Sequence, residues 1–250
     1  MANSVKQRLA QIEWTSKDTF SLDGIDYALE DVGIRHEGEA LSVMKPVSYF
    51  RSYGEIIRDA PTRNVFELGI RKGGSAVFLA SLFQVEKLAT LDISGPAPAL
   101  ETFRKTHPLG ARIAPYYRTS QDDEAKLKTI VAQEFDGPLD LVIDDASHFY
   151  ELTKASFEIL FPFVRTGGFY VIEDWQWAHQ RGFMHWQDQP ALSNLVFQLM
   201  MAQISRPDLI AKIHVYPGIA FVQKGPAPPA EERLNLEELC WMQGRTFHLL

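Results

Sequence analysis

The stretch NVFELGIRKGGSAVFLASLFQ, at residues 64–84, decides the fold of this chain. Its first residues, NVFEL, form a short and mainly apolar run, which is typical of a strand buried on both faces. Three glycines, Gly69, Gly73 and Gly74, then allow the backbone to turn tightly. The apolar segment that follows, SAVFLASLF, predicts a helix. A strand, a tight turn and a helix in this order predict one βα unit of a parallel sheet.

The same alternation repeats along the chain. Further strands are predicted at 87–94, 111–120, 139–145 and 167–174, and further helices at 99–107, 124–135 and 150–164. The third strand is weaker, because Pro115 breaks it. A helix at 189–205 then precedes two short strands at 211–225, which are joined around Pro217-Gly218 as an antiparallel hairpin. The expected fold is therefore α/β: a doubly wound, mostly parallel seven-stranded sheet that ends in an antiparallel hairpin.

The segments around this alternation predict the domain organisation. Residues 1–45 are polar and mixed, with a short helix followed by turns and short extended pieces, and 46–61 have the spacing of an amphipathic helix. The segment GPAPPAEER, at 225–233, has the composition of a stiff linker. We expect an N-terminal arm at 1–45, a main domain at 46–225, and a C-terminal tail helix at 226–250.

Composition and charge argue against several classes of function. The net charge is −7 and the isoelectric point is about 5.5, which disfavours a surface for nucleic acid or for anionic membranes. The only cysteine, Cys240, cannot form an intrachain disulfide, so a reducing compartment is expected. The segment at 1–14 lacks the long apolar core of a signal peptide, and no run is long enough to span a bilayer. We expect a cytoplasmic protein without nucleic-acid or membrane partners.

The glycine loop and the end of the next strand together predict a ligand site. The loop has the spacing G-x-x-x-G-G, which is neither the G-x-G-x-x-G of dinucleotide sites nor a phosphate loop ending in GK[ST]. Glu67 closes the first strand, and Asp92 lies at the tip of the second, where a carboxylate can accept hydrogen bonds from ribose hydroxyls. In the alternative, the glycines make only a tight turn. Binding is favoured, because ligands lie at the carboxyl ends of such strands.

Two pairs of carboxylates end two later strands. Asp144-Asp145 close the fourth strand in LVIDDASHFY, with His148 three residues further on, and Glu173-Asp174 close the fifth. Neighbouring strand tips converge, so four carboxylates there repel one another unless a cation lies between them. Oxygen ligands of this kind suit Mg²⁺ or Mn²⁺. In the alternative, these residues cap helices, pair with arginines or lie exposed. Their joint occurrence at adjacent strand tips favours the metal site.

The chain resembles the class I S-adenosylmethionine-dependent methyltransferases over about residues 60–225. The segments ELGIRKGGS, TLDIS and HVYPGIAFVQ carry the resemblance. It implies that S-adenosylmethionine is the cofactor, that Gly69 and Gly74 approach it, and that Asp92 holds its ribose. The segment RTSQDDE is similar to the adenine-side loop of that family. The cofactor-binding residues expected on this basis are Glu67, Gly69, Arg71, Gly74, Ser75, Asp92, Ser120, Gln121, Asp122 and Asp144.

A narrower resemblance rests on IDDASH and VIEDWQ. They are similar to the I-D-D-G-S-H and V-I-E-D patterns of the metal-dependent sugar O-methyltransferases of macrolide and other antibiotic pathways, and of the related family named for cephalosporin hydroxylase. This resemblance implies that Asp145, Glu173 and Asp174 hold Mg²⁺ and that His148 is the general base. Ala146 stands where glycine is usual, which changes little unless the position needs a positive φ.

The expected function is Mg²⁺-dependent transfer of a methyl group from S-adenosylmethionine to a hydroxyl of a sugar or glycosylated natural product, in antibiotic biosynthesis. The resemblance also implies that the arm at 1–45 serves as a lid or an oligomer contact, and that the enzyme is a homo-oligomer. A sugar hydroxyl is too weakly acidic to attack a methyl group at neutral pH, whereas a metal lowers its pKa and an imidazole can take the proton. Two alternatives stay open. One is a hydroxylase or a hydroxylase-associated S-adenosylmethionine-binding protein, and the other is a non-catalytic binding module on the same fold.

The link after Asp174, WQWAHQRGFMHWQDQPA, is long for a connection between a strand and a helix. It predicts either a lid whose aromatic rings stack on the acceptor or a segment that packs on the sheet edge or on a partner subunit. Tyr49, Tyr53 and Arg51 are expected to close the opposite side of the pocket. The aromatic and histidine residues of the link are Trp175, Trp177, His179, Phe183, His185 and Trp186.

Overall fold

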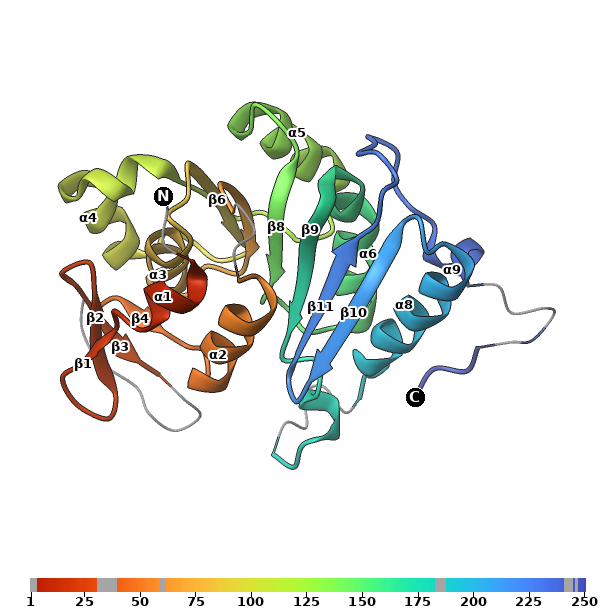
Figure 1. Ribbon diagram of the computed structural model, residues 1–250, viewed down its shortest axis with the longest axis horizontal. Helices are drawn as coiled ribbons and strands as arrows, with labels where there is room; N and C mark the ends of the chain where they lie inside the picture. The colour runs from red at the N-terminus through yellow and green to blue at the C-terminus, as the bar shows by residue number, and fades with distance from the viewer. Residues whose placement is uncertain (1–3, 31–39, 59–61, 183–187, 241–244, 246) are drawn as a thin grey trace. The chain divides into compact units, whose positions relative to one another are not determined.

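The computed structural model describes residues 4–30, 40–58, 62–182, 188–240, 245 and 247–250. The chain forms two compact units, Met1–Thr119 and Ser120–Leu250 (Figure 1). Both contain fully buried aromatic and aliphatic side chains, so each has a hydrophobic core of its own. The division into an arm at 1–45, a main domain at 46–225 and a tail at 226–250 stays a prediction.

The first unit begins with a small sheet, where the sequence predicts only a short helix, turns and extended pieces. Its elements are α1 Val5–Leu9, β1 Glu13–Trp14, β2 Thr19–Leu22, β3 Ile25–Leu29 and β4 Ser42–Val43. The strands follow the order β1-β2-β3-β4, and β3 pairs with β4 in parallel. Phe20 and Tyr27 stack at 5.1 Å, and both meet Phe78 edge to face. These strands are too short to show a period, which is why the sequence does not reveal the sheet.

The predicted helix at 46–61 is present as α2, Val47–Ile56. Its apolar side faces the core of the first unit, where Tyr49 and Tyr53 are 2% and 0% exposed. The expectation that these two tyrosines close a substrate pocket is therefore wrong. Their helical spacing marks a buried face, which is the commoner reason for such a pattern.

The rest of the first unit repeats the predicted βα alternation. Its elements are β5 Asn64–Leu68, α3 Gly74–Phe83, β6 Lys87–Asp92, α4 Pro98–Thr106, the 3₁₀ helix η1 Pro108–Arg112 and β7 Ile113–Tyr117. Strand β6 lies in parallel between β5 and β7. The expectation that Pro115 breaks β7 is wrong, because Pro115 lies within the strand, in register with Thr90. Strand β7 is the last in its sheet, and an edge strand tolerates a residue without an N–H.

The second unit contains the remaining predicted elements. They are α5 Glu124–Glu134, β8 Leu139–Asp144, α6 Tyr150–Leu160, η2 Phe161–Phe163, β9 Val164–Glu173, η3 Trp177–His179, α8 Ser193–Ser205, β10 Ile210–Tyr216, β11 Ile219–Lys224 and α9 Leu236–Leu239. Strands β8 and β9 are parallel, whereas β11 runs antiparallel to β9. Strands β10 and β11 form the predicted hairpin around Pro217-Gly218.

The large sheet has the strand order β10-β11-β9-β8-β5-β6-β7. The predicted fold class is therefore confirmed: the sheet is doubly wound and mostly parallel, and it ends in an antiparallel hairpin. In the first unit, the glycine loop and Asp92 follow the carboxyl ends of β5 and β6, and in the second, the acidic pairs follow those of β8 and β9. Within the described ranges, no helix combines the length and the apolar character that a membrane span requires.

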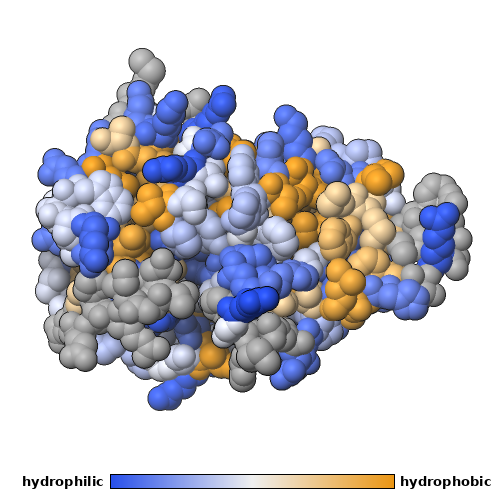
Figure 2. Space-filling model, turned by 90° about the horizontal axis from the view of Figure 1, so that it is seen from below, coloured by the Kyte–Doolittle hydropathy of each residue, from blue (hydrophilic) through white to orange (hydrophobic). Residues whose placement is uncertain are grey.

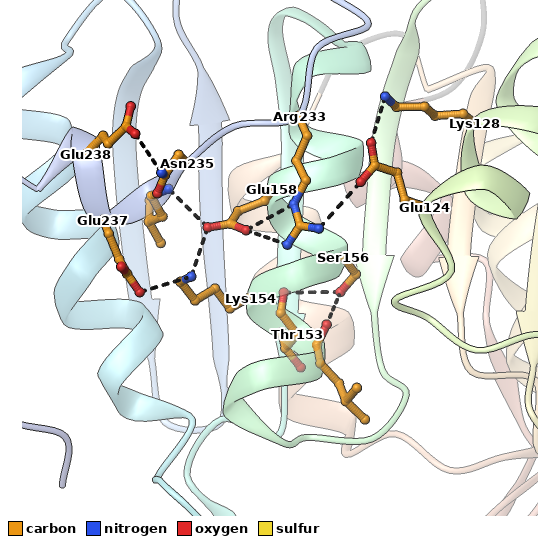
Figure 3. Close-up of polar contacts among 12 residues, drawn as sticks. Glu124, Lys128, Thr153, Lys154, Ser156, Glu158, Arg233, Asn235, Glu237 and Glu238 are labelled. Carbon is orange, nitrogen blue, oxygen red and sulfur yellow. Dashed lines mark hydrogen bonds and ion pairs between the residues drawn. The ribbon is translucent and has the colours of Figure 1, made fainter.

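The C-terminal segment of the second unit is held on α6 by a network of ion pairs (Figure 3). The buried Glu158 carboxylate accepts hydrogen bonds from Arg233 Nη2 at 2.8 Å and from the backbone N–H of Leu236 at 3.0 Å. Lys154 Nζ lies 3.0 Å from the same carboxylate, and Arg233 also reaches Glu124 at 3.5 Å. The end of the predicted linker is thus fixed to α6 and α5.

Candidate metal centre and cofactor loop

A glycine-rich loop joins β5 to α3 in the first unit. Its backbone has a positive φ at Gly69 (+104°), Arg71 (+48°) and Gly73 (+87°). Glycine adopts these angles without steric cost, whereas a positive φ at arginine is uncommon and often marks a functional site. The N–H of Gly69 donates to the carbonyl of Leu91 at 2.9 Å, which ties the start of the loop to β6.

Asp92, the residue predicted to hold a ribose, also holds this loop. Its Oδ2 accepts the backbone N–H groups of Ile70 at 2.9 Å and of Arg71 at 2.8 Å, and its Oδ1 accepts that of Ser94 at 2.7 Å. Burial alone raises the pKa of Asp92, but the hydrogen bonds from Arg71, Ser94 and Ile70 outweigh it, and the pKa is lowered. The carboxylate is therefore ionised at neutral pH and fixes the shape of the loop.

The other residues predicted from the first unit are buried around the loop. Glu67 is 0% exposed, and its Oε2 accepts a hydrogen bond from Thr90 at 3.2 Å. Ser75 is buried in the first turn of α3. The loop residue Lys72 donates to the buried Glu30, which follows β3, at 2.7 Å. The small N-terminal sheet thus contacts the glycine loop directly, and the cofactor contacts of Glu67, Gly69, Arg71 and Ser75 stay predictions.

Gly74 has a packing role that the sequence does not reveal. A Cβ atom at this position would lie 2.2 Å from the carbonyl oxygen of Ser42 and 2.6 Å from its nitrogen. Real Cβ atoms do not approach backbone so closely, so β4 can pass over the start of α3 only because residue 74 is glycine. This packing alone accounts for glycine at position 74, and the predicted approach of Gly74 to the cofactor stays a prediction.

Replacing Gly74 with alanine is expected to lower the free energy of unfolding by about 3 kcal/mol or more, because backbone atoms of β4 must move. Urea unfolding followed by circular dichroism measures the effect. The matched control is Gly95→Ala, where an added Cβ meets nothing within 4 Å. If both variants unfold at the same urea concentration, β4 does not lie against Gly74.

The predicted adenine-side residues fall into two groups in the second unit. Ser120 and Asp122 bond to each other at the surface side of the loop before α5, and Asp122 is exposed. Gln121 points the other way and is 4% exposed. Its Nε2 donates to the Asp144 carboxylate at 3.2 and 3.3 Å, and its Oε1 accepts the N–H of Ser147 at 2.9 Å. The structure therefore brings Gln121 to the acidic loop after β8.

Asp144 is directed into the protein interior. Its Oδ2 accepts hydrogen bonds from Ser156 Oγ at 2.6 Å and from the Tyr170 hydroxyl at 2.7 Å, and Gln121 Nε2 also donates to the carboxylate. Burial raises the pKa of Asp144 to about 6, although the hydrogen bonds from Ser156 and Tyr170 partly offset this effect, and the nearby charge of Asp145 adds to it. The side chain is 2% exposed. Its role as a direct cofactor ligand stays a prediction.

Asp145, His148 and Asp174 form one group. Each offers one ligand atom, and these atoms all lie within 4.8 Å of one another. Asp145 follows β8, His148 precedes α6, and Asp174 follows β9, as the convergence of parallel strand tips predicts. His148 and Asp174 both have a left-handed backbone, with φ of +58° and +56°. Non-glycine residues in this conformation cost about 1–3 kcal/mol and gather at functional sites.

Glu173 is not a member of this group. It is the last residue of β9, lies opposite Ile219 of β11 and is 1% exposed. The alternative in which Asp145 caps the next helix has no support, because the N-cap of α6 is Phe149 and has no side-chain cap. Ser147 Oγ does accept the N–H of Phe149 at 3.2 Å, just before the helix.

The link after Asp174 begins with residues that contact the site and the hairpin. The ring of Trp177 lies 4.3 Å from that of His148 at an angle of 58°. Trp175 Nε1 donates to the carbonyl of Tyr216 at 3.1 Å, and His179 Nε2 lies 2.8 Å from Ser193 Oγ. Trp175 and His179 thus bond to neighbouring elements of the second unit. These contacts agree with the alternative in which the link packs against the sheet edge. Phe183, His185 and Trp186 lie outside the described residues.

The model of one protein family, described as rhamnosyl O-methyltransferase/CmcI, matches residues 39–188, which is more than half of the chain. The chain belongs to the rhamnosyl O-methyltransferase/CmcI family. The glycine loop, Asp92 and the group of Asp145, His148 and Asp174 all lie within the matched residues. The predicted resemblance to the sugar O-methyltransferases is therefore confirmed.

Several relatives of this family member carry specific names. Mycinamicin VI 2''-O-methyltransferase of Micromonospora griseorubida is 34% identical over 172 residues, which cover 61% of this chain and 40% of the relative. Demethylmacrocin O-methyltransferase of Streptomyces fradiae is 33% identical over 135 residues, covering 42% of this chain and 34% of the relative. The methyltransferase MycE, solved with Mg and SAH, has a TM-score of 0.55 and 31% identity over 71% of this chain and 49% of MycE. The chain thus spans less than half the length of these relatives.

Sequence patterns miss two features of this rhamnosyl O-methyltransferase/CmcI family member. Gln121 bonds to Asp144 and to the loop before α6. Lys72 pairs with Glu30, 42 positions earlier. Both are long-range contacts between polar residues, for which no local pattern exists.

Proposed function

We propose that this protein is a Mg²⁺-dependent O-methyltransferase that moves the methyl group of S-adenosylmethionine to a hydroxyl of a sugar on a natural product. The group of Asp145, His148 and Asp174 at the carboxyl ends of β8 and β9 carries the proposal. MycE supports it, since that relative was solved with Mg and SAH and also with mycinamycin VI. S-adenosylhomocysteine is what remains of S-adenosylmethionine after methyl transfer.

The residues present fit a hard divalent cation. Two carboxylates and one imidazole offer ligand atoms within 4.8 Å of one another, and oxygen ligands are those that Mg²⁺ and Mn²⁺ prefer. We assign Asp145 and Asp174 as ligands and retain Glu173 as a third, with His148 as the base. Bound there, such a cation lowers the pKa of a nearby hydroxyl group.

Proton transfer is assigned to the imidazole of His148. An imidazole can accept a proton near neutral pH. The Trp177 ring, 4.3 Å away, limits the orientations that the imidazole can take. The methyl sulfonium needs no activation, so the remaining requirement is an acceptor oxygen held in line, within about 3–3.5 Å of the methyl carbon.

Cofactor binding is assigned to the glycine loop of the first unit. Asp92 fixes this loop through the N–H groups of Ile70 and Arg71 and remains ionised. Carboxylate oxygens have further lone pairs, so Asp92 can also accept ribose hydroxyls. Ser120 and Asp122 remain the proposed contacts of the adenine.

The acceptor is proposed to be a glycosylated small molecule, as for the relatives that act on mycinamicin VI and on rhamnosyl tetracenomycin-C. We also propose a homo-oligomer that works in the cytoplasm. Hydrophobic residues gather in patches on the face drawn in Figure 2, and Phe197, Met200 and Ile204 of α8 are exposed with helical spacing. A monomer in sedimentation equilibrium would contradict the oligomer.

The proposed function is tested by calorimetric titration of the chelated protein, first with S-adenosylmethionine and then with Mg²⁺. Binding of both is expected, and turnover with a vicinal diol sugar should add about 14 mass units to the acceptor. A gain of about 16 mass units would indicate hydroxylation instead. Binding of the cofactor without any response to Mg²⁺ would show that Asp145, His148 and Asp174 do not form a metal site.

A further inference from the structure

We propose that Gln121 is a positioning residue for the metal centre, because it fixes the loop that carries Asp145 and His148. The sequence places Gln121 in the adenine-side loop, and nothing in its pattern connects it with a metal. The inference rests on the proposed function, since it takes Asp145 and His148 as working parts of that centre. Gln121 would thus support the metal centre without touching either the cation or the substrate.

The side-chain amide of Gln121 uses both of its ends inside the protein. Nε2 donates to both oxygens of Asp144, at 3.2 and 3.3 Å, and lies 3.2 Å from Ser156 Oγ. Oε1 accepts the N–H of Ser147 at 2.9 Å. A backbone N–H can only donate, so the orientation of the amide is set by its partners. An amide side chain can donate to a carboxylate through its nitrogen and accept a backbone N–H through its oxygen at once.

Asp144 gives Gln121 a rigid anchor. The Tyr170 hydroxyl, from β9, and Ser156 Oγ, from α6, both donate to Asp144, at 2.7 and 2.6 Å. Ser156 Oγ also lies 3.1 Å from the carbonyl oxygen of Thr153, one turn earlier on α6 (Figure 3). The four side chains of this network come from three elements and from the loop before α5. A buried and satisfied network of this kind is stiffer than its separate pairs.

The loop between β8 and α6 needs such an anchor. Ser147 lies between Asp145 and His148, and His148 has a left-handed backbone, which is uncommon for residues other than glycine. The N–H of Ser147 is held by Gln121, and its hydroxyl holds the N–H of Phe149 at the start of α6. Ligand atoms must be placed within about 0.5 Å for tight metal binding, so a loosened Ser147 displaces ligand and base together.

The test measures Mn²⁺ affinity by electron paramagnetic resonance on the full chain, with S-adenosylmethionine affinity measured in parallel. Gln121→Met keeps the volume of the side chain and removes the amide. It is expected to weaken Mn²⁺ binding about 10- to 100-fold, as is usual for a residue behind the ligands, and to leave the cofactor Kd unchanged. The matched control is Gln203→Met. In the wild type, the Gln203 amide donates to the carbonyl of Ala211 at the surface of the same unit. That variant should match the wild type in both affinities.

A second readout does not depend on metal. Hydrogen exchange of the peptide containing Ser147 should be faster in Gln121→Met and unchanged in Gln203→Met, because only the first loses the bond to Ser147. If the wild type binds no Mn²⁺, the proposed function fails, and the exchange rates still report whether Gln121 holds the loop. If Gln121→Met does not fold, Tyr170→Phe removes one bond to Asp144 and is expected to weaken Mn²⁺ about fivefold.

Three outcomes overturn the proposal. Unchanged Mn²⁺ affinity in a folded Gln121→Met or, failing that, in Tyr170→Phe shows that the network does not position the metal centre. Loss of cofactor binding with unchanged Mn²⁺ affinity assigns Gln121 to the adenine, as the sequence predicts. Unchanged hydrogen exchange at Ser147 shows that the bond to Gln121 does not hold the loop.

Discussion

Replacing His148 with alanine is expected to lower kcat by about 10²- to 10⁴-fold, the usual contribution of a positioned general base. The imidazole lies beside Trp177 and within 4.8 Å of ligand atoms of Asp145 and Asp174. With a cation held by those carboxylates, His148 would lie close enough to take a proton from a hydroxyl group near the cation. The affinity for S-adenosylmethionine should be unchanged, because His148 is not among the residues that we assign to the cofactor. Steady-state kinetics and calorimetry measure the two effects separately.

The same variant distinguishes a base from a ligand. A base can be removed with little change in metal affinity, whereas the loss of a ligand should weaken Mn²⁺ binding together with kcat. We expect the first result. The control is His214→Ala, on β10, which should leave both quantities at their wild-type values. A His148→Ala enzyme with wild-type kcat would exclude the histidine from catalysis, and a large loss of Mn²⁺ affinity would make it a ligand.

Much of the fold follows from the sequence because short apolar runs alternate with longer helical segments. Apolar runs such as LVI in β8 and FYVI in β9 are typical of strands in a sheet that is covered on both sides. The small sheet at the N-terminus escapes this reasoning, since its strands have two to five residues. Pro115 leads to a wrong prediction of a broken strand, because the rule against proline in strands does not hold at a sheet edge.

The candidate site is predictable where topology decides and unpredictable where orientation decides. Parallel strands bring their carboxyl ends together, so the meeting of Asp145 with Asp174 follows from two acidic pairs after two neighbouring strands. Sequence does not say which member of each pair turns inward. The structure turns Asp144 towards Tyr170, and Gln121 follows it into the interior. A polar residue at a strand-helix junction looks the same in sequence whether it faces solvent or a buried carboxylate.

Replacing Asp145 with asparagine is expected to weaken Mg²⁺ binding by more than about 100-fold, beyond the usual effect of residues behind the ligands. The exchange keeps the shape of the side chain and removes one charge from a group that also contains Asp174. Calorimetric titration of the chelated protein with Mg²⁺ measures the loss. Asp136→Asn, at an exposed position of the same unit, is the control and should titrate as the wild type does.

Thermal unfolding of Asp145→Asn separates a ligand from a structural residue. Mg²⁺ at 100 times its Kd should stabilise the wild type by about 2.7 kcal/mol, because it binds only the folded protein. The variant should lose this gain. Without metal, it should be at least as stable as the wild type, because a like charge near Asp144 and Asp174 is removed. If Asp145 were instead a structural partner of the backbone, the metal-free variant would lose about 1 kcal/mol and the wild type would not respond to Mg²⁺.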